Sequence, residues 1–268
     1  MKAVWLATLA ACGTNLTPSG DDRPPVVLDC LPNLDRRIDV AELPLPSAAK
    51  GSYWVSSNVA VDLAGAVAGT DRRWDWSQLA SGDQLVEVEA TGLAGAWFAA
   101  TFPRGELVAP LDLEHTAVGV LARDAEVLTL LGIASSDPDP PAGRTLVVYD
   151  TPIPLYEFPI VADAHWAATG VISHGNGTID GLPFIGEHRY DVAVAAIGEL
   201  DLPELTIQQA FRIDTQITIA PSSGPSVARR SASFVFECLG EVARATSRDG
   251  EASPEFRVAA EVRRLGFQ

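Results

Sequence analysis

The sequence is poor in lysine, cysteine, methionine and histidine. Its 268 residues include one methionine, three cysteines, four histidines and two lysines, Lys2 and Lys50. With 19 basic against 35 acidic residues, the formal net charge is −16. A surface of that sign repels phosphate backbones and anionic lipid headgroups. The composition therefore argues against a nucleic-acid partner and against direct docking on an anionic membrane.

Long apolar runs and helical periodicity are also scarce. No stretch reaches the roughly 20 apolar residues of a membrane-spanning helix. A 3.6-residue spacing is seen only over one or two turns around Trp76 to Ala80. From about Ser52 onward, short apolar runs alternate with clusters of Gly, Pro, Asp and Ser. This pattern is typical of strands joined by turns.

The clearest predicted strand runs from Leu205 to Ile219. Most of the apolar residues fall at odd positions, namely Leu205, Ile207, Phe211, Ile213, Ile217 and Ile219, whereas Gln208, Arg212, Asp214, Gln216 and Thr218 fall at even positions. Such alternation predicts one dry face, with Phe211, and one wet face, with Arg212. We expect the strand to lie centrally, because an exposed edge of this length would invite aggregation.

Near the C-terminus the apolar positions are even, with turns expected at Leu239-Gly240 and Asp249-Gly250. The residues predicted to share that face are Phe234, Phe236, Cys238, Val242, Phe256, Val258, Ala260 and Val262. Further strands are expected at Tyr53–Asp62, Gln84–Ala90, Ala96–Phe102, Thr116–Ala122, Glu126–Ile133, Thr145–Tyr149, Ala164–Ser173 and Arg189–Ile197. We predict one all-β domain over residues 28–268, either a single antiparallel β-sandwich or a curved half-open barrel with long strands.

The first dozen residues have a separate character. Met1-Lys2 precedes a short apolar run that ends in Leu9-Ala10-Ala11-Cys12. This order resembles the lipobox of bacterial lipoproteins, which implies a signal peptide at 1–11 and lipidation of Cys12. The residue after Cys12 is Gly13 and not the aspartate that favours retention at the inner membrane of enteric bacteria. The resemblance therefore implies the outer membrane. The alternative is an ordinary apolar N-terminus with a chance cysteine.

Residues 12–27 are polar and proline-bearing, which predicts a tether that holds the domain away from the bilayer. Cys30 and Cys238 then remain as an even pair in a chain expected to reach an oxidising space. We predict a disulfide between them. The alternative is two unpaired thiols.

Metal ligands and catalytic groups form no convincing pattern. The stretch from Asn176 to Glu187 overlays an EF-hand calcium loop, but Asn replaces the first Asp and strands flank it, so a turn is expected. His165, His174 and His188 fit no standard zinc spacing. We therefore predict no catalytic residue, no metal site and no cofactor.

A second match, to two short motifs of serine enzymes, is weak because of where the motifs lie in the chain. Ser47-Ala-Ala-Lys50 and Ser56-Ser57-Asn58 match two elements of penicillin-binding proteins and β-lactamases. In those enzymes the first element opens a helix and the second lies far downstream, and a Lys-Thr-Gly element follows. Here the two elements adjoin at a strand and Lys-Thr-Gly is missing, which favours coincidence.

The segment Gly69 to Leu79 contains Trp74-Asp75-Trp76-Ser77. With the downstream run Gly175 to Ile179, it resembles exported β-rich proteins of unassigned function from Bacteroidetes and related bacteria. The resemblance implies an exported β domain and supplies no activity. In physical terms, Trp74 and Trp76 share one parity and are expected to pack on a sheet, with Asp75 or Ser77 capping the next turn.

Together these features predict a membrane-anchored lipoprotein of the cell envelope. The leading hypothesis for its activity is a non-catalytic binding or structural module, whose partner would be an envelope protein, a glycan or a lipid. The second hypothesis is a carrier of an apolar ligand such as lipid, held in a half-barrel cavity. The third is an extracytoplasmic hydrolase. A wide apolar cavity would favour the carrier, and a filled core the module.

Overall fold

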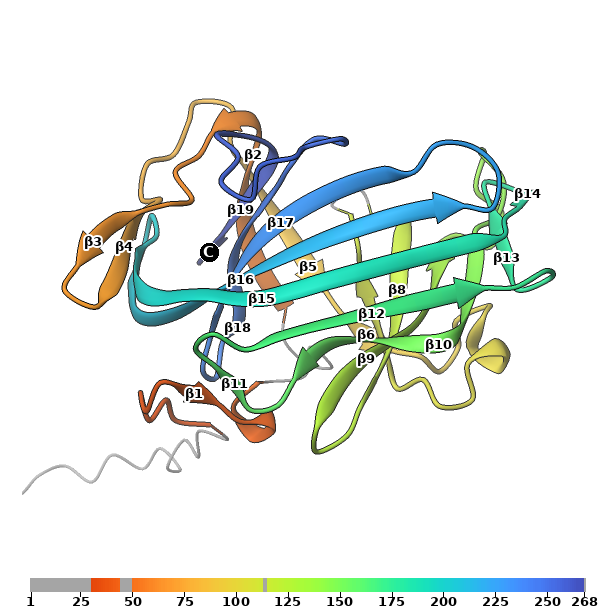
Figure 1. Ribbon diagram of the computed structural model, residues 1–268, viewed down its shortest axis with the longest axis horizontal. Coiled ribbons are helices and arrows are strands. Elements are labelled where there is room, and N and C mark those ends of the chain that lie inside the picture. Colours follow the sequence, from red (N-terminus) through yellow and green to blue (C-terminus); the bar gives the residue numbers. More distant parts are fainter. Residues whose placement is uncertain (1–29, 44–49, 113–114, 268) are drawn as a thin grey trace, which may run out of the picture.

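The computed structural model describes residues 30–43, 50–112 and 115–267, and the regular structure in these residues is almost entirely strand (Figure 1). Two single turns of 3-10 helix, η1 (Val40–Glu42) and η2 (Ala99–Thr101), complete it. The all-β prediction is confirmed. Neither of these short helices within the described residues has the length or apolar character to cross a membrane.

Ten strands form the large sheet, antiparallel except where β4 pairs with β15 in parallel. The order along this sheet is β3 (Ala66–Ala68), β4 (Asp71–Asp75), β15 (Gly186–Asp201), β16 (Thr206–Pro221), β17 (Val227–Phe236), β18 (Gly240–Thr246), β19 (Val258–Gly266), β2 (Lys50–Ala60) and β5 (Gln84–Glu89). The tenth strand, β12 (His165–Ile172), pairs with β15 beyond the end of β4.

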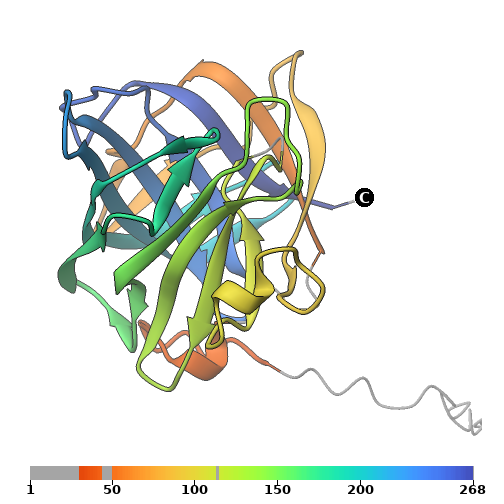
Figure 2. The same ribbon diagram turned by 90° about the vertical axis from the view of Figure 1, so that its right-hand side faces the viewer.

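Seven strands form the small sheet, which lies in front of the large sheet in Figure 2. Their order is β14 (Leu182–Pro183), β13 (Gly177–Ile179), β10 (Leu146–Glu157), β9 (Val127–Ser135), β8 (Ala117–Arg123), β7 (Leu107–Pro110) and β6 (Thr91–Gly92). A two-stranded ribbon of β1 (Arg37–Ile38) and β11 (Ile160–Val161) joins the N-terminal segment to the body.

Side-chain alternation explains how the sheets pack. Along β15 the even residues from Gly186 to Val194 are buried, whereas Glu187 and Arg189 are exposed. The buried side chains meet Leu128, Leu130 and other inner residues of the small sheet in one apolar core. This face-to-face contact of two open sheets is the sandwich arrangement.

Two further cores lie outside that interface. On the opposite face of the large sheet, Trp74 and Trp76 pack edge-on against Phe234, with ring centroids 4.8 and 4.9 Å apart. On the outer face of the small sheet, Phe98 and Phe102 cover the apolar side chains of β8 and β9. Each sheet is therefore covered on both faces over part of its length.

The predicted strand at Ala96–Phe102 is wrong, because this run forms a turn followed by η2. Phe98 and Phe102, four residues apart, both reach the small sheet from that turn. The Phe102 ring lies so close to Gly132 that a Cβ there would come within 2.5 Å of it. The apolar run thus buries its aromatics as a cover and not as a strand.

The helical turn expected around Trp76 to Ala80 is also not formed. The Trp76 amide donates to the carbonyl of Asp201 at 2.8 Å, which keeps the chain extended past the end of β4. Asp75 Oδ1 accepts hydrogen bonds from the amide and hydroxyl of Ser77, but no helical turn follows for either residue to cap. The prediction that Trp74 and Trp76 pack on a sheet is confirmed.

The long strand predicted at Leu205 to Ile219 is confirmed as β16, which lies between β15 and β17. Its two faces are not as predicted. A bulge opposite Glu199 reverses the side-chain parity, so Ile207 faces the core around Trp74 whereas Phe211 faces the core between the sheets. Arg212, predicted on a wet face, is 3% exposed.

The even-numbered face predicted near the C-terminus is confirmed only in part. Phe234, Val242 and Val262 are buried, but Val258 is 45% exposed while its neighbour Ala259 is fully buried. Both turns form at the expected positions, after β17 and after β18.

Candidate functional site

The disulfide predicted between Cys30 and Cys238 is present, with the two Cα atoms 5.5 Å apart. Cys238 does not continue the face of Phe234 and Phe236, as the sequence pattern suggested. It lies in the turn after β17 with φ of +64°, and the turn directs its side chain toward Cys30. The other predicted site residue, Cys12, and the predicted segments 1–11 and 12–27 lie outside the described residues.

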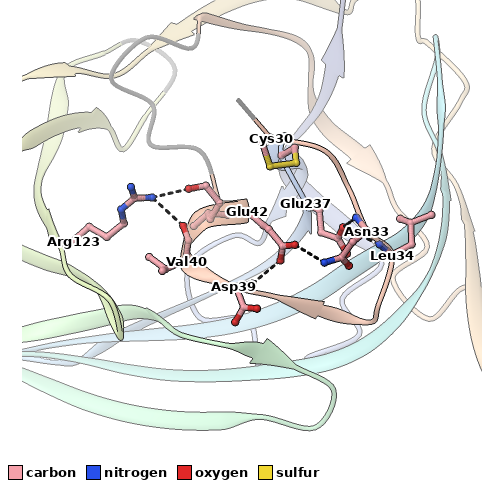
Figure 3. The surroundings of a disulfide bond; sticks show 10 residues. Cys30, Asn33, Leu34, Asp39, Val40, Glu42, Arg123 and Glu237 are labelled. Atoms are coloured by element: carbon pink, nitrogen blue, oxygen red, sulfur yellow. Dashed lines mark hydrogen bonds between the residues drawn. A yellow bond between two sulfur atoms is a disulfide. The ribbon is translucent and has the colours of Figure 1, made fainter. Parts of the chain in front are cut away.

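A buried carboxylate reinforces the disulfide (Figure 3). Glu237 is fully buried, and its Oε2 accepts hydrogen bonds from the amides of Asn33 at 2.6 Å and Leu34 at 3.0 Å. The Asn33 side chain donates in turn to Glu42 at 2.7 Å. Backbone amides that pair with a carboxylate compensate much of the cost of its burial.

We call residues 30–43 the N-terminal strap. Hydrogen bonds attach it to both sheets. The Cys238 amide donates to the carbonyl of Glu42 at 2.7 Å, on the large-sheet side. Arg123, at the end of β8 in the small sheet, donates to the carbonyls of Val40 and Leu43 (Figure 3). The disulfide and these hydrogen bonds thus have a structural role, because they hold the N-terminal strap on the two sheets.

The three histidines considered as zinc ligands are not brought together. His165 and His174 are exposed, whereas His188 is buried beside Tyr149, with 2.7 Å between Nδ1 and the hydroxyl. Burial lowers the pKa of His188 to about 4. Across the described parts of the chain, no three His, Cys, Asp or Glu side chains approach closely enough to hold a metal ion.

The stretch that overlays a calcium loop forms a hairpin of β13 and β14, with Asp180 and Gly181 at its tip. Asn176 and Ser173, just before it, donate to the exposed carboxylate of Asp150. These hydrogen bonds lower the pKa of Asp150, with that from Ser173 the largest. The side chains of this region therefore fix a turn, as expected.

Ser56, from the weak enzyme-like motif, belongs to a buried polar cluster with Asp83 and Arg264. The guanidinium of Arg264 donates to the Ser56 hydroxyl, to Asp83 at 2.7 Å and to the carbonyl of Gln78. Burial alone would raise the pKa of Asp83, but hydrogen bonds from Ser56 and Ala80 and the charge of Arg264 outweigh it and lower the pKa. The cluster holds residues 78–83 against β2 and β19.

Two pockets border this cluster, with volumes of about 220 and 420 Å³. The smaller one includes Asp62, Asp75 and Trp76, so the tryptophan-rich segment contributes to it. A third pocket of about 210 Å³ lies beside Asp191, Asp214 and Arg230 on the large sheet. The charged residues that line each of these three pockets sum to a net charge of −1.

The largest of the four pockets described lies on the outer face of the small sheet, with a volume of about 440 Å³. Its lining combines apolar and proline side chains with Arg104, Arg123 and Asp124. No sequence pattern indicated this pocket, because its residues come from three separate segments that only the sheet brings together. We call this pocket the Arg104 groove.

Comparisons of the chain with protein-family models, curated proteins and solved structures found no match. The resemblance of the Trp74–Ser77 segment to exported β-rich proteins stays a prediction.

Proposed function

We propose that the chain is a lipid-anchored module of a bacterial cell envelope, which faces an extracytoplasmic space and binds a partner or ligand without catalysis. The anchor would be diacylglycerol on Cys12, and the outer membrane is the preferred location because Gly13 follows it. Acyl chains hold a protein on a bilayer because each buried methylene contributes about 0.8 kcal/mol.

The observation that carries the proposal is the Cys30–Cys238 disulfide. Disulfides persist in oxidising compartments and are rare in the reducing cytosol of mesophiles. The bond also suits a tethered domain, since it joins the point where the predicted tether reaches the fold to the turn after β17. Force on an anchor at Cys12 would pass through Cys238 into the large sheet.

The packing of the body favours a binding module over a carrier of apolar ligands. A carrier needs a lumen, but aromatic and aliphatic side chains from both sheets, including Phe211, Trp166 and Ile153, fill the space between the sheets. The buried charges of Arg264 and Arg212 are held by Asp83 and Asp214, as in structural ion pairs. The open Arg104 groove is a surface site of the size that small ligands use.

The lipid anchor is tested by Cys12→Ala. We expect this variant to leave the membrane fraction and to lose incorporation of radiolabelled palmitate, because the acidic body has no other lipid attachment. The matched control is the double variant Cys30→Ser/Cys238→Ser, which keeps Cys12 and should remain on membranes. Retention of Cys12→Ala on membranes after a high-salt wash would contradict the proposal.

A further inference from the structure

The edge of the large sheet at β3 (Ala66–Ala68) differs in composition from the terminal strands β5 and β14. β3 is the last strand in the order of its sheet, and within the described residues it pairs with β4 alone. At the other end of this sheet, β5 carries the exposed Glu87 and Glu89, and β14 of the small sheet contains Pro183. Charge and proline on an edge strand hinder pairing with another chain. β3 has neither.

The hairpin of β3 and β4 is exposed and already ordered. It lies at the left-hand end of the molecule in Figure 1, and its Val67 is 72% exposed. At the base of the hairpin, the buried Trp74 donates from Nε1 to the carbonyl of Leu63 at 2.7 Å, and the amide of Gly65 donates to Asp62 at 3.1 Å. A strand that is ordered in advance loses little conformational entropy when a second strand pairs with it.

The charge of this hairpin does not oppose contact between two copies of the chain. Across residues 66–75, two arginines balance two aspartates, so the net charge is zero. Residues 63–70, which include β3, have no charged side chain. The whole chain carries −16, so contact between other parts of two copies tends to bring acidic surfaces together.

The sequence around β3 is symmetric about Val67. Gly65-Ala66-Val67-Ala68-Gly69 reads the same in both directions. If two copies of this strand pair antiparallel about a two-fold axis at Val67, the two Val67 residues lie opposite each other, and each Ala66 lies opposite the second copy's Ala68. β-branched residues pair favourably across strands, and the small alanines leave room for them. The edge therefore fits a second copy of itself.

We infer that two copies of the chain associate through β3, by antiparallel pairing that is centred on Val67 and joins the two large sheets. Backbone N–H and C=O groups at the free edge of β3 supply the hydrogen bonds, and the opposed Val67 side chains supply apolar contact. A pairing of about five residues covers less than the roughly 1,000 Å² of a stable interface, so the association is weak and reversible. The inference goes beyond the proposed function and holds whether or not Cys12 is acylated.

Cysteine cross-linking tests the contact, because it traps even a weak dimer. In the full chain carrying Cys12→Ala, the two remaining cysteines, Cys30 and Cys238, are joined to each other. Val67→Cys in this chain should give a disulfide-linked dimer under mild oxidation, because directly opposed residues of antiparallel strands have Cα atoms about 4.5–5.5 Å apart. Leu182→Cys is the matched control and should cross-link much more slowly, since Leu182 is 71% exposed but belongs to β14 at the right-hand end of Figure 1.

A mixture of Ala66→Cys and Ala68→Cys tests the register. An affinity tag on one of the two variants separates mixed dimers from dimers of identical copies. Mixed dimers should form in excess, because Ala66 lies opposite the second copy's Ala68. Identical positions are about 7–8 Å apart in this register, which is beyond the reach of a disulfide.

Val67→Lys tests the association without a cross-link. Two lysines opposed at the two-fold axis repel each other and replace the apolar contact, so the dissociation constant of the dimer should rise about tenfold. Leu182→Lys is the control and should leave the constant unchanged. Sedimentation equilibrium over a wide range of protein concentrations measures the constant, and thermal unfolding verifies that each variant is folded.

Equal rates of cross-linking for Val67→Cys and Leu182→Cys would overturn the inference, and so would equal effects of the two lysine variants. A random distribution of dimers from the mixture of Ala66→Cys and Ala68→Cys would overturn it as well, because the strands would not pair in the inferred register. A chain that stays monomeric at every concentration and forms no Val67→Cys dimer would leave the edge for a strand of another protein. None of these outcomes bears on the anchor, because Cys12 is replaced throughout.

Discussion

Arg212 lies in the middle of β16 with its guanidinium buried between three acceptors. It donates to Asp214 at 2.8 Å, to Glu255 at 2.9 Å and to the carbonyl of Leu63. Burial raises the pKa of Asp214, and the charge and hydrogen bonds of Arg212 offset only part of that rise. A carboxylate in this position depends on its cation, so removal of Arg212 leaves a poorly solvated charge.

We predict that Arg212→Gln lowers the free energy of unfolding by about 3 kcal/mol, the usual cost of removing one partner from a buried ion pair. Arg229→Gln is the control, because Arg229 and its partner Asp249 are 56% and 55% exposed. That change should cost about 0.5 kcal/mol or less. Urea unfolding followed by tryptophan fluorescence measures both, and similar losses for the two variants would contradict the burial of Arg212.

At the scale of the elements, the N-terminal strap is attached to the body by a disulfide, a short ribbon and several hydrogen bonds. Ile38 is fully buried and pairs with Ile160, while Leu43 is 5% exposed. The disulfide closes a loop with a sequence separation of 208. A cross-link of this span restricts the unfolded chain strongly, whereas the folded strap is also held by Glu237 and Arg123.

We predict that Cys30→Ser/Cys238→Ser lowers the free energy of unfolding by about 3–5 kcal/mol while the strap stays in place. Denaturant unfolding measures the loss, with reductant added to the unaltered protein as an independent route to the same state. Hydrogen exchange at the amides of Leu34 and Ile38 reports on the strap. Rapid exchange at both amides in the double variant would show that the disulfide alone holds the strap.

Sequence periodicity predicted most of the strands but not which face of each strand is buried along its whole length. The long strand at β16 was evident from alternation, yet the bulge after Ile207 reverses its parity with no Gly or Pro to mark it. Arg212 accordingly points into a covered region that the alternation assigned to solvent. Burial of a charge depends on tertiary cover from Leu63 and Glu255, which lie far away in sequence.

Among the site residues, only the disulfide cysteines could be predicted from the sequence. Two cysteines in a chain predicted to be exported indicate a bond between them, and the structure confirms the bond. The Arg104 groove has no such local signal, since Arg104 belongs to the aromatic cover, Arg123 to β8 and Pro152 to β10. The pocket becomes evident only when the sheet places these residues side by side.

At the scale of the whole molecule, the two sheets meet through polar as well as apolar side chains. His188 and Tyr190 come from β15 of the large sheet, and Tyr149 comes from β10 of the small sheet. Burial raises the pKa of Tyr190 to about 12 and that of Tyr149 well above its ordinary value, so both hydroxyls stay protonated at neutral and acid pH. His188 is then the group in this contact that titrates in mild acid.

The stability of the sandwich should therefore depend on pH through His188. Burial depresses its pKa from 6.5 to about 4, so the folded protein excludes a proton that the unfolded chain accepts. The stabilisation is fully present above about pH 6.5 and is lost as pH falls toward 4. Between about pH 7.5 and pH 4.5 this group alone should lower the free energy of unfolding by about 2–3 kcal/mol.

His188→Gln should remove that part of the pH dependence, whatever its effect at neutral pH, whereas His165→Gln at an exposed position should keep it. Urea unfolding of the three proteins across this range measures the slopes, and equal slopes for the unaltered protein and His188→Gln would mean that His188 is protonated within the fold.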